Sequence, residues 1–191
     1  MADILNQLTF FAFFQSLFLI LIFVVSARKR QRINIYLLIL VLVLMVGLIG
    51  RIGQFAFEWQ RQLKGLSEFS ILFFGPTVYL FVQSTLSEKR FSKEDLFHYI
   101  PGTVYSLIVT FYYITAPDAV ITERLETGEL IRVVRILVGI GLTVNITYFL
   151  LSILKFRALK KALQEEVSYS LNINFVNYFL VAVGICLLTW L

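Results

Sequence analysis

The feature that most constrains this chain is a series of six apolar stretches, each about long enough to cross a lipid bilayer as a helix. A transmembrane helix needs roughly 20 apolar residues, because the hydrocarbon core is about 30 Å thick. The predicted spans are Leu8 to Ala27, Ile33 to about Gly50, Phe69 to Leu86, Leu96 to Ala116, Ile131 to Leu154, and Leu171 to Leu191. Their connections are short, so the sequence predicts an all-α, polytopic transmembrane helical bundle that forms one domain over residues 1–191.

Composition excludes an ordinary soluble domain. Hydrophobic residues make up 59% of the chain and charged residues only 15%, whereas soluble proteins average about 45–50% and about 25%. A domain of this size keeps much of its surface exposed, so lipid must cover the apolar excess. The net charge of +5 comes from short basic clusters between the spans, which is typical of membrane topology signals. We therefore expect this segment itself to bind no nucleic acid.

The basic residues fall in alternate connections, which predicts the orientation of the chain. The connections after the first, third and fifth spans hold 11 of the 17 basic residues: Arg28, Lys29, Arg30, Arg32, Lys89, Arg90, Lys93, Lys155, Arg157, Lys160 and Lys161. The other connections balance their basic residues with acids, as between Pro117 and Leu130. Because the Lys and Arg of short loops collect on the cytoplasmic side, we expect a multi-pass protein of a bacterial inner membrane with its N-terminus outside.

The third predicted span contains a helix-bending sequence, Phe74-Gly75-Pro76, followed one turn later by Tyr79. Proline removes a backbone hydrogen bond, and glycine lets a neighbouring helix approach closely. Two interpretations stay open. Gly75 and Pro76 form a packing kink, or they form a hinge that passes a signal across the bilayer.

The fourth predicted span begins after Ser92 with two acids, which suit the positive end of the helix dipole. Asp95 and His98 share a helix face, so the carboxylate can hold the imidazole charged and make the pair sensitive to pH. Alternatively, the pair simply anchors the end of the helix at the membrane surface. We expect a second bend near Pro101, just beyond His98.

Three polar residues within or near the spans are candidates for facing a ligand: Arg51, Arg135 and Asn145. An intramembrane charge costs roughly 2.5–3.5 kcal/mol on insertion scales, so it is usually retained for function. Arg51 and Arg135 are close to the outer ends of their spans, where a long side chain can also reach water. Asn145 lies deep in the fifth span and can instead form a hydrogen bond between helices.

The sequence contains none of the common catalytic or nucleotide-binding patterns, such as a P-loop, HExxH or GxSxG, and it has no paired intramembrane acids. His98 is the only histidine and Cys186 the only cysteine, so a metal centre or a catalytic dyad lacks partners. We therefore expect no enzymatic activity, no cofactor and no metal.

The segment Phe74-Gly75-Pro76-x-x-Tyr79-Leu80, a short basic loop, and then Asp95-Leu96-x-His98-Tyr99-Ile100-Pro101 resembles a pattern in bacterial membrane-bound AraC-type transcriptional regulators. The resemblance implies a heptahelical membrane sensor joined to a cytoplasmic helix-turn-helix domain. In that family pattern a seventh span returns the chain to the cytoplasm. This sequence stops after six spans, so it is a piece of a longer protein or a stand-alone relative, and its abrupt apolar end favours the piece.

Two functional hypotheses follow. The first is the membrane-embedded sensor, or input domain, of a one-component transcriptional regulator. A small-molecule or membrane stimulus would shift its helix packing, and the signal would reach a DNA-binding domain absent from this chain. The surrounding partner is the lipid bilayer, with a second copy of the chain as a further partner to consider. The alternative is a small transporter or channel-like membrane protein, which the helix bends favour and the scarcity of buried polar residues opposes.

Overall fold

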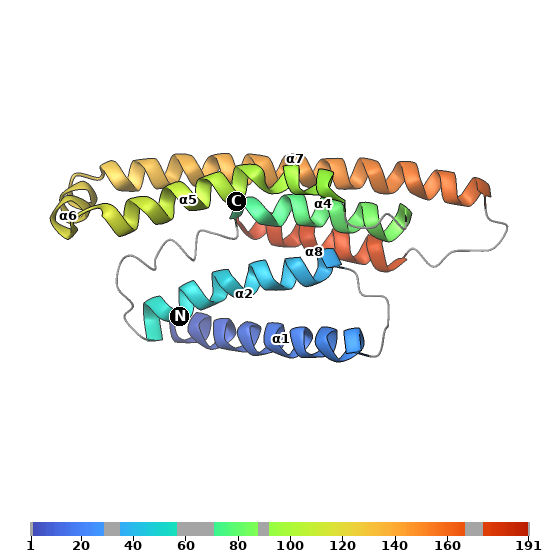
Figure 1. Ribbon diagram of the computed structural model, residues 1–191, viewed down its shortest axis with the longest axis horizontal. Helices are drawn as coiled ribbons and strands as arrows, with labels where there is room; N and C mark the ends of the chain where they lie inside the picture. Colours follow the sequence, from blue (N-terminus) through green and yellow to red (C-terminus); the bar gives the residue numbers. More distant parts are fainter. Residues whose placement is uncertain (1, 29–34, 57–70, 88–91, 167–173, 191) are drawn as a thin grey trace.

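The computed structural model describes residues 2–28, 35–56, 71–87, 92–166 and 174–190, and these residues are almost entirely helical (Figure 1). The elements are α1 (Ala2–Arg28), α2 (Ile35–Ala56), α4 (Ile71–Ser87), the 3-10 helix η2 (Lys93–Tyr99), α5 (Ile100–Thr115), α6 (Asp118–Glu126), α7 (Glu129–Glu166) and α8 (Asn174–Trp190). The described part of the chain contains no strand. The all-α prediction is therefore confirmed.

The long helices alternate in direction along the chain (Figure 1). The C-terminal ends of α1, α4 and α7 lie toward the right of Figure 1, and α6 lies at the opposite end of the molecule. These three helix ends are the ones that adjoin the predicted basic connections. The direction of each helix therefore agrees with a chain that passes back and forth between two sides.

Three of the described helices are long and apolar enough to cross a membrane on their own: Ile4–Val25, Ile35–Gly53 and Glu129–Ala158. They coincide with the first, second and fifth predicted spans. The apolar parts of α4 (Ile71–Thr85) and α8 (Phe175–Leu188) are shorter; the 17 residues of α4 measure about 26 Å at 1.5 Å per residue. The helices are those of a membrane protein, and the number of six spans stays a prediction.

The fourth predicted span differs in form from the expected single helix, and the fifth is longer than expected. Helices η2 and α5 together fill the place of the fourth, and α6 is turned by 110° from their line. The turn follows from Pro117, because the residue before a proline avoids the helical conformation, and Ala116 is extended (ψ 129°). α7 continues to Glu166, beyond the expected end at Leu154, because its Lys, Ala, Leu, Gln and Glu residues favour a helix.

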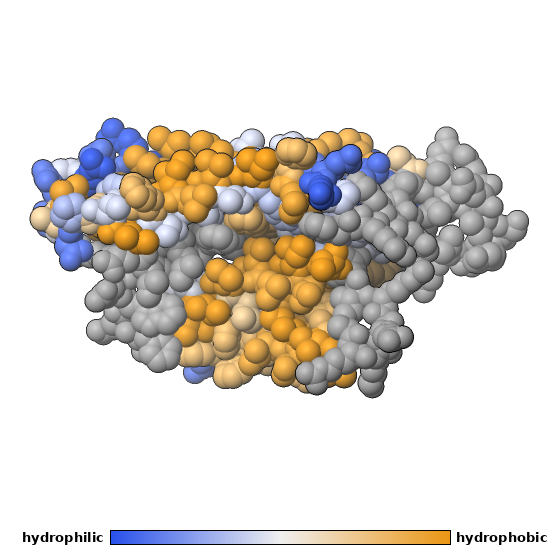
Figure 2. Space-filling model, viewed as in Figure 1, coloured by the Kyte–Doolittle hydropathy of each residue, from blue (hydrophilic) through white to orange (hydrophobic). Residues whose placement is uncertain are grey.

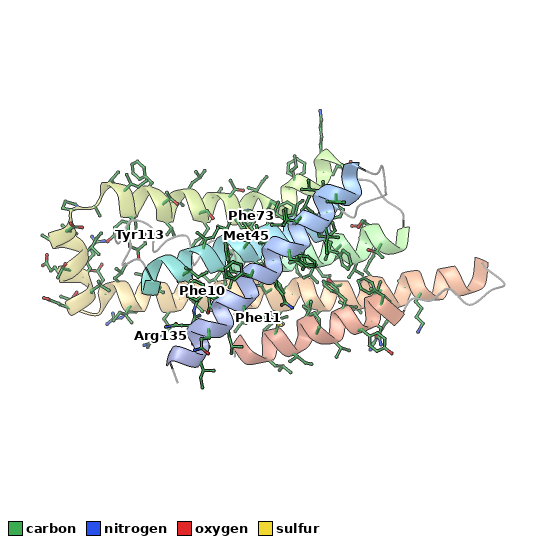
Figure 3. All side chains as sticks on the ribbon, turned by 90° about the horizontal axis from the view of Figure 1, so that it is seen from below. Phe10, Phe11, Met45, Phe73, Tyr113 and Arg135 are labelled. Atoms are coloured by element: carbon green, nitrogen blue, oxygen red, sulfur yellow. The ribbon has the colours of Figure 1, made fainter. Side chains whose placement is uncertain are left out.

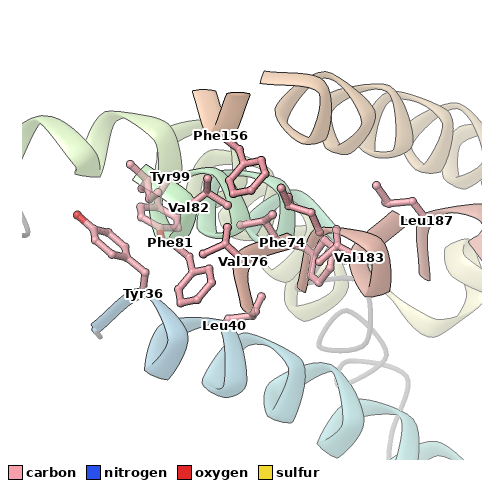
Figure 4. Close-up of a cluster of buried hydrophobic side chains, with 13 residues drawn as sticks. Tyr36, Leu40, Phe74, Phe81, Val82, Tyr99, Phe156, Val176, Val183 and Leu187 are labelled. Atoms are coloured by element: carbon pink, nitrogen blue, oxygen red, sulfur yellow. The ribbon is translucent and has the colours of Figure 1, made fainter. Parts of the chain in front are cut away.

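α4 lies at the centre of the bundle. It packs most extensively against α7 and also contacts α2, η2 and α5. The Phe81 ring reaches α8, where it meets the rings of Phe175 and Phe179. Almost every residue from 74 to 82 is buried, and their side chains form the middle of the apolar cluster in Figure 4. A helix that is apolar all round fits such a position.

α1 has the opposite surroundings. It packs against α2, and the two helices lie side by side in the lower part of Figure 1. Many of its large apolar side chains are exposed: Ile4, Leu5, Leu8, Phe11, Phe14, Phe18, Leu21 and Val25. Figure 2 shows the resulting apolar surface, which also extends over other helices. A surface of this kind is rare on a water-soluble monomer and is the normal surface of a helix in lipid.

Candidate functional site around α4

Asn145 joins α7 to the first turn of α4 by two hydrogen bonds. Its Oδ1 accepts a bond from the Gly75 N–H at 2.7 Å, and its Nδ2 donates one to the Ile71 carbonyl oxygen at 2.7 Å. Ile71 and Gly75 are four residues apart, so they are the two groups that an α-helix normally joins to each other. The Asn145 amide therefore contacts both groups of one backbone pair of α4, and only 1% of the residue is exposed. We call these three residues the amide clip.

The amide clip depends on the missing side chain of Gly75. A Cβ atom added there would lie 2.7 Å from the Asn145 Oδ1, 3.1 Å from the Asn145 Cα and 3.1 Å from the Tyr148 Cβ. Pro76 is buried beside it and cannot donate the next bond of the ladder. Pro76 thus removes one helical hydrogen bond, directly after the backbone pair that Asn145 contacts. This local weakness agrees with both interpretations of the motif, a packing contact and a hinge.

Asp95 of η2 connects that helix to α2. The residue is only 2% exposed, and its Oδ2 accepts hydrogen bonds from the Tyr36 hydroxyl and from the Ser92 N–H, the latter at 2.9 Å. The predicted helix start at Ser92 is confirmed, since Ser92 is the N-cap of η2. Burying a carboxyl group is costly unless it is hydrogen-bonded, so these bonds fix the first residues of η2 against the start of α2.

Three rings from three elements meet on the other side of η2. His98 Nδ1 lies 3.0 Å from the Tyr148 hydroxyl of α7. Tyr79 of α4 completes the group, with ring centroids 5.7 Å from His98 and 6.0 Å from Tyr148. We call these residues the ring cluster. The expected Asp95–His98 pairing is thus replaced by two separate contacts, because Tyr36 and Ser92 bind the carboxylate while Tyr148 binds the imidazole.

A fourth contact links the end of η2 to α4. The Thr77 hydroxyl lies 2.6 Å from the Phe73 carbonyl oxygen and 3.2 Å from the Tyr99 hydroxyl. The Tyr99 ring stacks on Phe73, with centroids 6.0 Å apart. A Cβ on Gly102 would touch the same Phe73 ring at 3.0 Å. Close packing therefore continues from η2 into the first turn of α5.

Pro101 is exposed in the first turn of α5 and does not bend a continuous helix. The change from 3-10 to α-helix comes just before it, at Ile100. The bend expected near Pro101 is corrected in this way, because proline at a helix start has no hydrogen bond to lose. Pro101 thus sets where α5 begins.

The three residues predicted to face a ligand do not meet at one place. Arg51 is exposed toward the end of α2, and Arg135 is exposed near the start of α7, ten residues or about 15 Å before Asn145. Figure 3 shows Arg135 and Tyr113 toward the α6 end of the molecule. The Asn145 amide faces the α4 backbone, and both of its polar groups are bonded there.

Tyr36, Thr77 and Tyr148 contribute to the site and were not singled out from the sequence. The spacing of Tyr148 offers a signal, because it follows Asn145 by three residues and so shares its helix face. Tyr36 offers none of this kind. It lies 59 residues before Asp95, and only the fold brings the two together.

The arrangement holds helices in place through polar contacts between them. Within the described residues, no group of three or more His, Cys, Asp or Glu side chains could hold a metal ion. No family model, no curated protein and no solved structure matches the chain. The site is therefore defined by its own geometry, as polar contacts that tie α4 to η2 and α7, and η2 to α2.

Proposed function

We propose that this chain is the membrane-embedded sensor, or input domain, of a one-component transcriptional regulator that passes its signal to a cytoplasmic DNA-binding domain. The observation that carries the proposal is the convergence of the motif residues on α4. Gly75, Pro76 and Tyr79 belong to α4, and His98 of η2 meets Tyr79, while Asp95 holds η2 to the start of α2. The motif resembles that of one family and also lies at the centre of the fold. We therefore expect it to transmit the signal between helices, as the resemblance implies.

The amide clip supplies a two-state element for such a signal. The Gly75 N–H can bond either to the Asn145 Oδ1, as observed, or to the Ile71 carbonyl oxygen in a continuous helix. A small separation of α4 from α7 would exchange one bond for the other while the backbone groups stay paired. Because such an exchange has two discrete end states, a stimulus that binds one state better shifts the population. The ring cluster, one turn further along α4, would carry the shift to η2.

The proposal includes six spans in a bacterial inner membrane with the N-terminus outside. In this orientation η2 and the ring cluster lie on the cytoplasmic side, where an output domain can receive the signal. A cysteine-labelling experiment in intact cells tests it, with Cys186 replaced by Ser. A membrane-impermeant maleimide should label Glu123→Cys on α6 and should not label Lys93→Cys on η2, both of which are exposed positions. The reverse pattern would contradict the orientation.

Regulation itself is tested with the full-length gene product in its own cell. Transcript profiles are compared between the parent strain, a deletion strain and an Asn145→Leu strain, with Thr147→Val as the control on the exposed side of α7. We expect the levels of a defined set of transcripts to change in the deletion strain. Asn145→Leu should fix the levels of the same transcripts at either their induced or their repressed value. Thr147→Val should not change them. An unchanged profile in the deletion, together with a native polypeptide that has no DNA-binding segment, would refute the proposal.

The alternative is a small transporter or channel. Such a protein needs polar groups along a path, whereas Thr77, Asp95 and Asn145 are bonded to neighbouring helices. Solute uptake or ion conductance in proteoliposomes, lost in Asn145→Leu, would favour this alternative over the sensor.

A further inference from the structure

A cavity of about 260 Å³ lies at the α6 end of the molecule, apart from the α4 site. It is bounded by α5, α6 and α7. Ile108 of α5 and Val134 and Leu137 of α7 line its apolar part, and Tyr112, Arg124 and Glu129 contribute its polar part. Each of the three elements therefore supplies one of the polar groups.

The cavity arises from the turn at Pro117. α6 is turned by 110° from the line of α5 and packs on α7, so it crosses the end of the pair. α5 has its main contacts at its other end, with η2 and α4. α5 and α7 consequently leave a wedge-shaped space next to α6. Apolar side chains of α5 and α7 line this wedge.

Arg124 can donate further hydrogen bonds at this wedge. Its guanidinium has five N–H donors, and within the described residues it makes one long hydrogen bond, 3.4 Å to the Tyr112 hydroxyl. Its Nε lies 3.8 Å from a Glu129 carboxylate oxygen, and its Cζ lies 5.8 Å from the centre of the Tyr112 ring. The ion pair is longer than a hydrogen bond, so a better-placed carboxylate can compete with Glu129 for the planar guanidinium.

We propose that this cavity binds one hydrocarbon chain of an amphiphile whose carboxylate head pairs with Arg124. The volume is slightly below the usual range for small-molecule sites, about 300–1,000 Å³, so it admits one chain and not the two of a diacyl lipid. The apolar lining matches the chain, and the guanidinium matches a carboxylate bidentately. Binding is expected whether or not the chain controls transcription, so the proposal does not rest on the regulatory function.

The test uses the 191-residue chain in phosphatidylcholine nanodiscs and a medium-chain fatty acid that carries a photoreactive diazirine on its chain. Labelled positions are mapped by mass spectrometry. We expect labelling to concentrate on the α5 and α7 residues that line the cavity. An excess of unlabelled fatty acid should abolish it, and additional phosphatidylcholine should not.

A matched pair of substitutions on α5 tests the cavity. Ile108→Trp fills it from a lining position, and Leu107→Trp adds the same ring at a neighbouring position that does not line it; the two residues are 63% and 65% exposed. We expect Ile108→Trp to lower labelling at the cavity at least about tenfold and Leu107→Trp to leave it unchanged. Val134→Phe, with Val138→Phe as its control, gives the same comparison from α7 should Ile108→Trp not fold.

A second pair tests the head group. Arg124→Gln should weaken competition by the fatty acid roughly tenfold, the effect of about 1.4 kcal/mol, and should not change competition by the fatty alcohol of equal length. Arg132→Gln, an exposed arginine outside the cavity lining, should change neither. The proposal is overturned by labelling spread evenly over the lipid-facing helices, by equal competition from phosphatidylcholine, or by an Arg124→Gln effect that is the same for acid and alcohol.

Discussion

α1 and α4 are both strongly apolar helices, yet one lies at the edge of the bundle and the other at its centre. α1 contacts α2 and exposes most of its large side chains, whereas α4 is surrounded by α2, η2, α5, α7 and α8. Hydrophobicity does not separate them, because lipid tails are as apolar as the interior of the bundle. Small and polar residues do separate them. α4 contains Gly75, Pro76 and Thr77 in sequence, which allow close approach and bonding between helices.

The hydroxyl groups of the two helices show the same difference. In α1, Thr9 and Ser16 donate to the carbonyl oxygens of Leu5 and Ala12, four residues earlier in the same helix. In α4, Thr77 lies within hydrogen-bonding distance of Tyr99 of η2 as well as of its own helix. These two hydroxyl groups of α1 therefore bond within their own helix, whereas Thr77 of α4 also links two helices.

The largest expected effect comes from two phenylalanines in opposite surroundings. Phe81 of α4 is 2% exposed and Phe18 of α1 is 63% exposed. Phe81→Ala should lower the free energy of unfolding by about 3–5 kcal/mol because it leaves a cavity, and Phe18→Ala should change it by less than about 0.5 kcal/mol. Denaturant titration in mixed micelles measures both. Similar losses from the two variants would remove the distinction between the helices.

The next effect concerns close approach at Gly75. Gly75→Ala should destabilise the chain by about 3 kcal/mol, the upper end for overpacking, because the added Cβ meets the Asn145 backbone as well as its amide. Gly139→Ala on α7 is the control, since a Cβ there has no neighbour within 4 Å. It should stabilise the helix by up to about 1 kcal/mol. Effects of the same sign in the same titration would contradict the account of the clip.

A smaller loss is expected on removing one hydroxyl group at the base of α2. Tyr36→Phe leaves the buried Asp95 with one bond fewer, which should cost about 2 kcal/mol, as for hydrogen bonds to charged groups. Tyr178→Phe removes the same group from an exposed position on α8 and should have no measurable effect. An unchanged free energy of unfolding in Tyr36→Phe would show that the Asp95 carboxylate accepts an equally strong hydrogen bond from another group.

The smallest effect is expected from the clip itself. Asn145→Ala should cost only about 1 kcal/mol, because the Gly75 N–H and the Ile71 carbonyl oxygen can then bond to each other. In a double-mutant cycle, Asn145→Ala should recover part of the loss caused by Gly75→Ala, since the nearest clashing atom is the Asn145 Oδ1. Additive losses would mean that the amide does not set the distance between α4 and α7.

The sequence predicts the helices well and their neighbours poorly. Apolar length identified α1, α2 and α7, and the acids after Ser92 identified the start of η2, because these signals are local. Lipid-facing and protein-facing apolar residues look alike, so the apolar residues of α4 do not by themselves place it in the middle. Asn145 forms hydrogen bonds between helices, as the sequence predicts. Its partners on α4 could not be predicted, because they are backbone groups, which every residue has.

The central claim is that α1 faces lipid while α4 faces protein. Its most direct test is labelling of the chain in bilayer vesicles with a lipid-soluble carbene reagent, followed by mapping of the modified residues. We predict strong labelling at Phe11, Phe14 and Phe18 and almost none at Val78, Phe81 and Val82, which are exposed and buried respectively. Labelling of α4 as strong as that of α1 would contradict the account.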